Sequence, residues 1–219
     1  MKTTYIIFIR HGETFGNQEQ IAHGQTESPL NERGIAQAAS TAERLKTWHR
    51  PYKRVYASTL SRALDTAKHV SEALALPLHT NDGLKEGSLG DWEGVTYQEL
   101  SDLEFAKRSI KDDDFDGHNG ESPNQLAKRM VAALNGIRTV HQDENIIIVS
   151  HGAAIAHTIA TLLETKPVFG YQYIMHNSAI TELAFTPTPS MECFNLFDHL
   201  PEHLKTDPTG ANHNVDNSK

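Results

Sequence analysis

Two short apolar strands that each end in a His-Gly pair constrain this chain more than any other feature. The first is Thr3–Arg10, followed by His11-Gly12, and the second is Asn145–Ser150, followed by His151-Gly152. Both segments have an uninterrupted apolar centre, which is typical of central strands covered on both faces. Ligands in open α/β sheets bind at the carboxyl ends of such strands. We therefore expect both imidazoles at one edge of one sheet.

Strand and helix patterns alternate through the first half of the chain. A helix is predicted from Asn31 to about Trp48 because apolar residues recur at spacings of three and four. It is followed by a strand at 54–57, a helix capped by Ser58 or Ser61, and an edge strand at about 76–80. This alternation predicts right-handed β-α-β crossovers and a largely parallel sheet.

The second half departs from this alternation once. Residues 94–120 are polar and charged, and we interpret them as a helical insertion followed by an exposed loop. A long helix is then expected from Ser122-Pro123 to about His141, and two last antiparallel strands at 180–185 and 193–197. The predicted fold is α/β, with three α/β/α layers and a mostly parallel sheet carrying one antiparallel edge strand. We expect residues 1–200 to form one domain. Residues 201–219 are polar, and we interpret them as a flexible tail.

Charge and composition exclude several classes of protein. A net charge of −8 and a pI of about 5.9 argue against general nucleic-acid binding and anionic-membrane binding, which need a basic surface. The single cysteine, Cys193, excludes an intramolecular disulfide framework. No apolar run approaches the length of a membrane span, and the N-terminus lacks the features of a signal peptide. We expect a cytoplasmic protein, and a homodimer stays open.

An ordered set of motifs surrounds the two histidines and carries a family resemblance. It consists of Arg10-His11-Gly12-Glu13-Thr14, Asn17, Ser58–Ala63 with Thr66-Ala67, Glu86 and Ser150-His151-Gly152, together with Leu30–Gly34, Gly90–Gly94 and Gly120–Ser122. This set resembles the histidine phosphatase superfamily, the phosphoglycerate-mutase-like group, from residue 3 to about 185. The resemblance implies that residues 1–200 are a single catalytic domain of this type.

Phosphoryl transfer needs positive charge around the transferring group. Arg10, at the end of the first strand, and Arg62, in the first turn of a helix, both supply fork-shaped donors to phosphate. Asn17 can donate an amide N–H, and Gly152 belongs to the matched motif at the second strand end. Arg10, Asn17, Arg62 and Gly152 are therefore the predicted phosphate-binding residues. Without the resemblance, a surface arginine on an exposed helix would be the better interpretation of Arg62.

The resemblance makes His11 the nucleophile. A neutral imidazole nitrogen can attack phosphorus and form a phosphohistidine, while its other nitrogen needs an acceptor such as a backbone carbonyl. His151 is implied to be the electrostatic partner that binds the phosphoryl group. A lone histidine at a strand end is more often structural, and only the pairing with His11 favours a catalytic role.

The leaving alkoxide needs a proton. Glu86 matches the family's proton-donor position. Glu93 and Glu13 are competitors, and we interpret Glu93 as structural and Glu13 as fixing the loop. No metal or cofactor is expected, because His199 and His203, four residues apart, have no third ligand in sight. The predicted catalytic residues are His11, Glu86 and His151.

The same residues can hydrolyse a phosphate ester or move phosphate between two hydroxyls. Mutases of the family carry cations for a substrate carboxylate, and the corresponding stretch 87–92 has none. Lys107-Arg108 could imitate a second mutase pair, but acidic residues follow at 112–116. We therefore favour a metal-independent phosphomonoesterase that acts on a small-molecule phosphate ester and releases inorganic phosphate. A cofactor-dependent phosphoglycerate mutase and a catalytically silent phospho-ligand binding module are the alternatives.

The leaving group is not readable from one sequence. Sugar phosphates, phosphoglycerates, nucleotides and a cobalamin-precursor phosphate are all compatible with the phosphate-binding residues. The acidic insertion favours a neutral or hydroxyl-rich leaving group.

Overall fold

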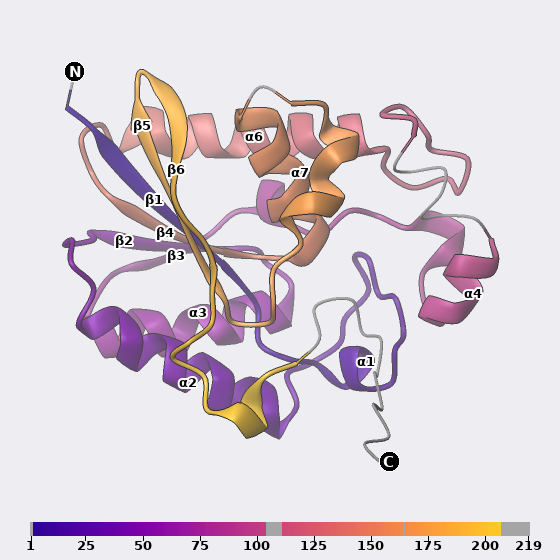
Figure 1. Cartoon of the computed structure of the whole chain (residues 1–219), viewed down its shortest axis with the longest axis horizontal. Coiled ribbons are helices and arrows are strands. Elements are labelled where there is room, and N and C mark those ends of the chain that lie inside the picture. Colours follow the sequence, from indigo (N-terminus) through magenta and orange to yellow (C-terminus); the bar gives the residue numbers. More distant parts are fainter. Residues whose placement is uncertain (1, 104–110, 164, 207–219) are drawn as a thin grey trace, which may run out of the picture.

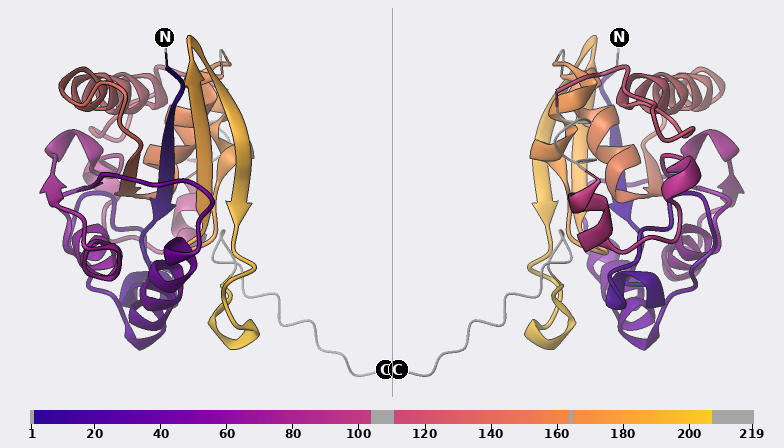
Figure 2. Two further views of the ribbon diagram at one scale, coloured as in Figure 1. Left: turned by 90° about the vertical axis from the view of Figure 1, so that its left-hand side faces the viewer. Right: turned by 90° about the vertical axis from the view of Figure 1, so that its right-hand side faces the viewer.

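A computed structural model describes residues 2–103, 111–163 and 165–206. It is a three-layer α/β/α structure (Figure 1; Figure 2). Six strands form the central sheet in the order β3-β2-β4-β1-β5-β6. Their bounds are β1 Thr4–Arg10, β2 Arg54–Ala57, β3 Leu78–Thr80, β4 Ile146–Ser150, β5 Ile180–Thr186 and β6 Thr188–Leu196.

The sheet is mostly parallel, as predicted. Parallel pairs join β1 to β4, β4 to β2 and β2 to β3. β5 runs antiparallel to β1, and β6 runs antiparallel to β5. The strand that opposes the others is therefore β5, which lies one position inside the edge, and the edge itself is β6. β5 and β6 thus form an antiparallel edge pair, in agreement with the two last antiparallel strands expected from the sequence.

Helices cover both faces of the sheet. They are α1 Phe15–Gln18, α2 Glu32–Lys46, α3 Ser61–Leu74, α4 Tyr97–Asp102, α6 Pro123–Val140 and α7 Gly152–Leu162, with short 3-10 turns at η1 Asp82–Leu84, η2 Gly90–Trp92, η3 Pro167–Tyr173 and η4 Glu202–Leu204. In Figure 1, α2 and α3 lie on one side of the strands, and α6 and α7 lie on the other. Asn31 caps α2 as expected, because its side chain accepts the Gly34 N–H at 2.8 Å.

Each face of the sheet has its own hydrophobic core, because side chains alternate along a strand. Ile6 and Phe8 of β1 face α6 and α7, whereas Ile7 and Ile9 face α2 and α3. The same alternation holds in β4, and none of these β1 side chains is more than 1% exposed. Continuous apolar strands are thus explained by burial on both sides.

The two strands that end in histidine are direct neighbours. Arg10 pairs with Ser150, and the His11 N–H donates to the Ser150 carbonyl at 3.0 Å. The chain leaves β1 toward α2 on one face and leaves β4 into α7 on the other (Figure 1). Such a reversal opens a crevice at the carboxyl ends of the two strands. The topology therefore brings the two His-Gly units together, as predicted.

The first residues of the expected tail are packed on the domain. Leu204 is buried, and its carbonyl accepts the Gln37 side-chain N–H at 2.6 Å. The Thr206 hydroxyl donates to the Asn177 side chain at 3.2 Å. The ordered domain thus runs at least to residue 206, because Leu204 has an apolar side chain to bury. The rest of the predicted tail, 207–219, lies outside the described residues, as does Lys107-Arg108.

The expected insertion contains one described helix, α4, followed by a loop over 111–121. Within the described ranges, no helix is both long enough and apolar enough to cross a membrane.

Candidate active site

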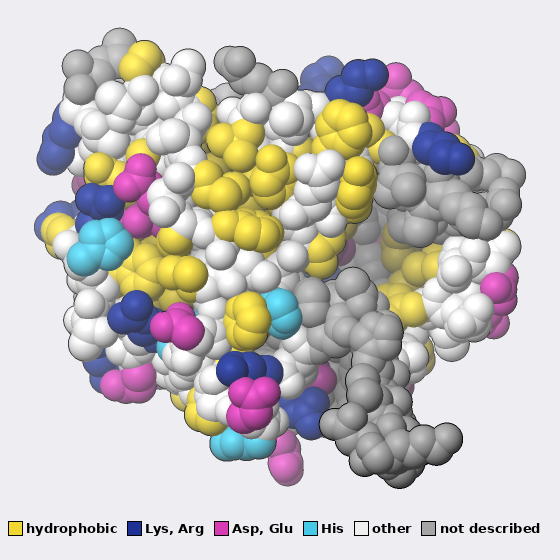
Figure 3. Space-filling view, in the orientation of Figure 1, with side chains coloured by type: hydrophobic (Ala, Val, Ile, Leu, Met, Phe, Trp, Pro, Cys, Tyr) yellow, Lys and Arg dark blue, Asp and Glu magenta, His cyan; other side chains and the backbone are white. Residues whose placement is uncertain are grey.

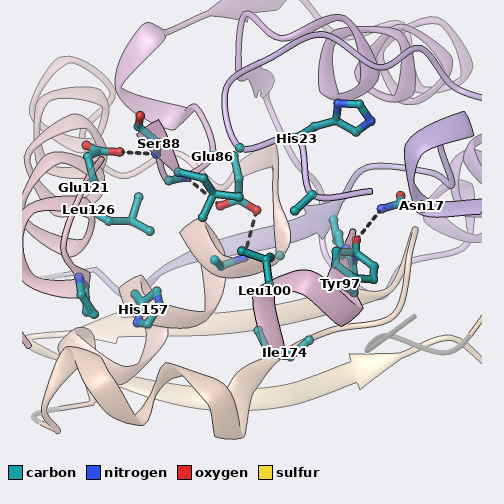
Figure 4. A pocket seen from close by; sticks show the side chains of 18 of the residues that line it. Asn17, His23, Glu86, Ser88, Tyr97, Leu100, Glu121, Leu126, His157 and Ile174 are labelled. Carbon is teal, nitrogen blue, oxygen red and sulfur yellow. Dashed lines mark hydrogen bonds between the residues drawn. The ribbon is translucent and has the colours of Figure 1, made fainter. Parts of the chain in front are cut away.

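A cavity of about 440 Å³ opens at the carboxyl ends of β1 and β4. Figure 4 shows side chains that line it. Six of the seven predicted site residues line the cavity, namely Arg10, His11, Asn17, Arg62, Glu86 and Gly152. The seventh, His151, is fully buried directly behind them, with its ring centroid 5.2 Å from that of His11. Residues separated by most of the chain thus share one site.

His11 is held as a neutral imidazole. Its Nδ1 lies 2.7 Å from the Gly12 carbonyl oxygen, which can only accept, so Nδ1 carries the proton. Nε2 therefore keeps its lone pair, as expected for a nucleophile. Burial lowers the pKa of His11 well below its usual 6.5, and the nearby Arg62 and Arg10 lower it further.

The loop after His11 is held tightly against the start of α2. A Cβ on Gly12 would collide with the Gly34 carbonyl, and a Cβ on Gly34 would collide with the Glu13 carbonyl. The Glu13 carboxylate accepts from Asn31 at 2.8 Å and from Arg33 at 3.2 Å. Glu13 is absent from the described lining of the cavity, so it fixes the loop, in agreement with our interpretation of it.

Arg62 is not a surface arginine, since it is only 3% exposed. Its Nη1 donates to the Thr26 carbonyl at 2.9 Å, and its Nη2 donates to the Gly24 carbonyl at 2.6 Å. These carbonyls fix the guanidinium at the cavity wall. Arg10 is fixed similarly, with Nη1 donating to the Met175 carbonyl at 2.6 Å.

Arg10 lies close to Gly152 in the first turn of α7. A Cβ at residue 152 would lie 3.4 Å from the Arg10 Nε and 3.5 Å from its Cζ, which are ordinary van der Waals distances. The guanidinium therefore packs against the start of this helix. The start of α7 and Arg10 together form one positively polarised wall of the cavity.

His151 is engaged through both ring nitrogens. Arg62 Nε donates to its Nδ1 at 3.2 Å, and its Nε2 lies 2.8 Å from the Ser58 hydroxyl. Because an arginine can only donate, Nδ1 must be the acceptor, and Nε2 carries the proton. Burial lowers the pKa of His151 well below 6.5, and Arg62 adds to this effect. In this arrangement His151 orients Arg62 and reaches the cavity only through its neighbours.

Asn17 lies at the third position of α1 and lines the cavity. Its side-chain oxygen accepts the Thr14 N–H at 3.2 Å, and its Nδ2 donates to the Tyr97 hydroxyl at 3.4 Å (Figure 4). The capping interaction with Thr14 fixes the amide orientation, with its donor end toward the cavity side.

Glu86 reaches from its loop to the start of α7 (Figure 4). Its Oε1 accepts the Ala154 N–H at 2.7 Å and the Gly87 N–H at 2.9 Å, and its Oε2 accepts the Ala153 N–H at 3.1 Å. The carboxyl group thus caps a helix to which it is not adjacent in sequence. It is thereby fixed on the cavity wall.

Glu93, the competing carboxylate, does not belong to the described lining. Its Oε1 accepts the Gln25 N–H at 2.9 Å and the Leu89 N–H at 3.3 Å. It joins two loops beside the site, in agreement with a structural part.

Arg129 is a positioning residue that sequence reasoning did not identify. Its guanidinium is paired with Glu121 at 2.6 Å and donates to the Gly83, Lys85 and Glu86 carbonyls at 3.0 Å each. It therefore holds the backbone of the loop that carries Glu86. In the sequence, Arg129 is one charged residue within a predicted helix, and charged residues are common on exposed helix faces. Nothing therefore marked it as a positioning residue.

Sequence reasoning did not identify the part of the cavity wall that comes from α6, α7 and residues 168–174. It includes Leu126, His157, Val168, Tyr171 and Ile174. They share no motif, and only tertiary packing brings them together. In the described part of the chain, no three His, Cys, Asp or Glu side chains are grouped so as to hold a metal ion.

Comparison with known proteins gives one consistent result. Residues 6–193 match the family model of the histidine phosphatase superfamily (branch 1). A metal-independent phosphoserine phosphatase of Arabidopsis thaliana is 38% identical over 160 residues, which is 70% of this chain and 66% of that protein. The chain thus spans about two thirds of the length of this curated relative.

Two solved structures extend the likeness to nearly the whole chain. A phosphoserine phosphatase from Entamoeba histolytica, solved as a mutant with phosphoserine, is 32% identical with a TM-score of 0.79, covering 90% of this chain and all of that one. A mycobacterial glucosyl-3-phosphoglycerate phosphatase is 26% identical with a TM-score of 0.81, covering 89% of this chain and 100% of that one.

Proposed function

Because the chain belongs to the histidine phosphatase superfamily, we propose that it is a metal-independent phosphomonoesterase that works through a phosphohistidine on His11. The observation that carries this proposal is the state of His11. It is a buried, neutral imidazole with Nδ1 fixed by a carbonyl, and it lies between two arginines in a cavity.

In the first step, the His11 Nε2 lone pair forms a bond to phosphorus. The bond between phosphorus and the ester oxygen breaks, and its electron pair stays on that oxygen. Glu86, in its protonated form, gives its proton to this oxygen, so that an alcohol leaves. Arg10 and Arg62 stabilise the charge on the three equatorial oxygens.

In the second step, water attacks the phosphohistidine. Glu86, now a carboxylate, takes a proton from the water, the P–N bond breaks, and the electron pair returns to His11 Nε2. Inorganic phosphate leaves, and Glu86 is again protonated. Asn17 and the start of α7 at Gly152 bind phosphate oxygens in both steps.

His151 takes part through Arg62 in the described conformation. It would contact the phosphoryl group directly only if it exchanged its hydrogen bond with Arg62 or Ser58. We propose that His151 fixes the guanidinium of Arg62 in its position next to His11.

The names of the relatives support a phosphatase. Phosphoserine and glucosyl-3-phosphoglycerate, named for those relatives, are phosphomonoesters that also carry a carboxylate. A mutase would transfer the phosphoryl group from His11 to a second hydroxyl instead of to water. A silent binding module would bind phosphate without turnover.

The test is hydrolysis of 4-nitrophenyl phosphate in the presence of excess chelator. We expect turnover that the chelator does not reduce, together with an acid-labile phosphoprotein in rapid-quench samples. His11→Ala should abolish both. His203→Ala, at an exposed histidine on η4, is the matched control and should retain both. Phosphate binding without turnover would establish the binding module, and rapid phosphoglycerate exchange without hydrolysis would establish the mutase.

A further inference from the structure

The cavity extends well beyond the residues that would bind phosphate. The wall around Glu86 is mainly apolar, and Figure 4 shows Leu126, Leu100 and Ile174 around this part of the cavity. Figure 3 shows hydrophobic side chains on both sides of the recess between α4 and the middle of the molecule. The apolar described lining residues are Ile21, Ala22, Leu89, Leu100, Phe115, Pro123, Leu126, Ala153, Val168 and Ile174.

Positive charge is confined to the phosphate end. Among the described residues that line the cavity, Arg10 and Arg62 are the lysines and arginines present. Arg62 donates from three nitrogens, two to backbone carbonyls and one to His151, and Arg10 Nη1 donates to the Met175 carbonyl. The donors of the two arginines that face the cavity would bind the phosphate ester. No other described lysine or arginine lines the cavity to pair with a second anionic group on the substrate.

The three other histidines of the wall do not supply that charge. Burial lowers the pKa of His23, His118 and His157 below the usual 6.5, so each is neutral at neutral pH. The Glu121 carboxylate on the same wall is paired with Arg129 at 2.6 Å. The titratable side chains on this part of the cavity wall are therefore either neutral or negatively charged.

The rim is apolar as well. Tyr171 on η3 lines the cavity while 51% exposed, and the neighbouring Phe169, outside the described lining, is 38% exposed. An apolar leaving group that projects from the cavity would cover this surface, which is otherwise in contact with water.

We infer that the leaving group of the substrate is a bulky, uncharged and mainly apolar alcohol or phenol. The inference rests on the proposed phosphatase activity. It separates this chain from enzymes whose phosphate esters carry a carboxylate. Transfer of an unpaired carboxylate into this wall would be costly, whereas an alkyl or aryl group would replace water against apolar side chains.

One pair and one series of esters with matched reactivity test the inference. In the first, 2-phenylethyl phosphate is compared with the same ester bearing a ring carboxylate, whose distance leaves the basicity of the leaving oxygen nearly unchanged. We expect kcat/KM to fall by at least about tenfold when the carboxylate is present. In the second, a series of n-alkyl phosphates should gain up to about fourfold in kcat/KM per added methylene until the cavity is filled.

A charge-inserting variant locates the effect. Tyr171→Arg places a cation at the lining, and we expect the preference for the uncharged ester of the pair to fall by about two- to fivefold. Val140→Arg is the matched control. It introduces the same charge at an exposed apolar residue at the end of α6, outside the described lining, and should leave the preference unchanged.

The outcomes separate the inference from the function on which it rests. If the wild-type protein hydrolyses none of these esters, the proposed phosphatase activity is overturned. Robust hydrolysis with equal or higher kcat/KM for the carboxylated ester, or for phosphoserine, would leave the phosphatase intact and overturn the apolar leaving group.

Discussion

At His11, burial and neighbouring positive charge both lower the pKa of the imidazole. Desolvation disfavours the imidazolium, and two guanidinium groups near the ring disfavour it again. The pKa of His11 is therefore lowered by environment and neighbours together. The Gly12 carbonyl then decides which nitrogen is left to react.

Removal of one cation should raise the pKa of His11 toward its usual range. Arg62→Gln deletes the second-largest cause of the lowered pKa, after burial. His11 would then become protonated at a higher pH, and if it is the nucleophile, the acid limb of the pH profile of kcat/KM should move to higher pH. NMR titration of the His11 ring in the free protein measures this shift directly. Arg62→Lys, which keeps a positive charge, is the control, and an unchanged pKa in Arg62→Gln would contradict the assigned cause.

Glu86→Gln should separate the acid from the helix cap. The amide oxygen can still accept an N–H from the first turn of α7, but the side chain can no longer deliver a proton to the leaving oxygen. We expect an alkyl phosphate to lose on the order of 10²–10⁴-fold in kcat. 4-Nitrophenyl phosphate should lose far less, because its leaving group needs little protonation.

The control for this comparison is Glu93→Gln. Glu93 accepts two backbone N–H groups outside the described lining of the cavity, so its variant should not change the dependence of rate on leaving group. Equal losses for both esters in Glu86→Gln would mean that Glu86 is not the acid.

At the scale of elements, the loop after β1 depends on a close approach to α2. The carbonyl of Glu13 lies where a side chain on Gly34 would have to be placed. Gly34→Ala should therefore shift the loop that carries His11, lowering both the melting temperature and kcat. The added Cβ would collide with backbone atoms and not with a flexible side chain. The loop must therefore move to remove the collision.

Gly136→Ala is the matched variant for Gly34→Ala. Gly136 is an exposed residue inside α6, and no atom lies within 4 Å of the added Cβ. Alanine there should stabilise the protein by about 0.5–1 kcal/mol, because glycine is a poor helix former. Thermal unfolding of the two variants checks the pair, and a stabilised Gly34→Ala would contradict the packing argument.

Elements with strong periodic patterns were predictable from the sequence. Asn31 signals the start of α2 and Ser122-Pro123 the start of α6, and the structure places both helices there. The expectation that Ser58 or Ser61 caps α3 was wrong, because the N-cap is Leu60, whose side chain makes no capping hydrogen bond, and Ser61 is the first residue of the helix. The place of β5 inside the edge was not readable, because strand order depends on long-range pairing and not on local pattern.

The phosphate end of the site was more predictable than the rest of it. Arg10 is the last residue of a strand and His11 follows it in a contiguous motif, so their place at the carboxyl end of the strand was predictable from the sequence. Arg129 and Tyr171 contribute through contacts with distant segments, and nothing in their local sequence marks them. The engagement of His151 by Arg62 and Ser58 is likewise a property of packing.

At the scale of the whole molecule, two buried neutral histidines make stability depend on pH. Above about pH 6.5, His11 and His151 are neutral in both the folded and the unfolded protein. They therefore do not contribute to the pH dependence of the free energy of unfolding. Below it, the unfolded chain binds their protons first, because the folded pKa of each is lower. The free energy of unfolding should therefore decrease as the pH falls, by about 1.4 kcal/mol per pH unit for each histidine.

Denaturant unfolding between about pH 5 and pH 7.5 measures this dependence. His11→Gln should reduce the slope by about 1.4 kcal/mol per pH unit, since one titrating group is lost. His203→Gln, at an exposed residue, should leave the slope unchanged. A slope in His11→Gln equal to that of the wild type would contradict the neutral, buried state of His11.

The position of β1 between β4 and β5 has a consequence for biosynthesis. The strand that carries His11 is made first, yet both strands that pair with it are made more than 130 residues later. A nascent chain therefore exposes an apolar, unpaired strand until β4 and β5 have been synthesised, and such long-range pairing folds slowly. The cavity that brings His11 next to His151 can form only after this late pairing.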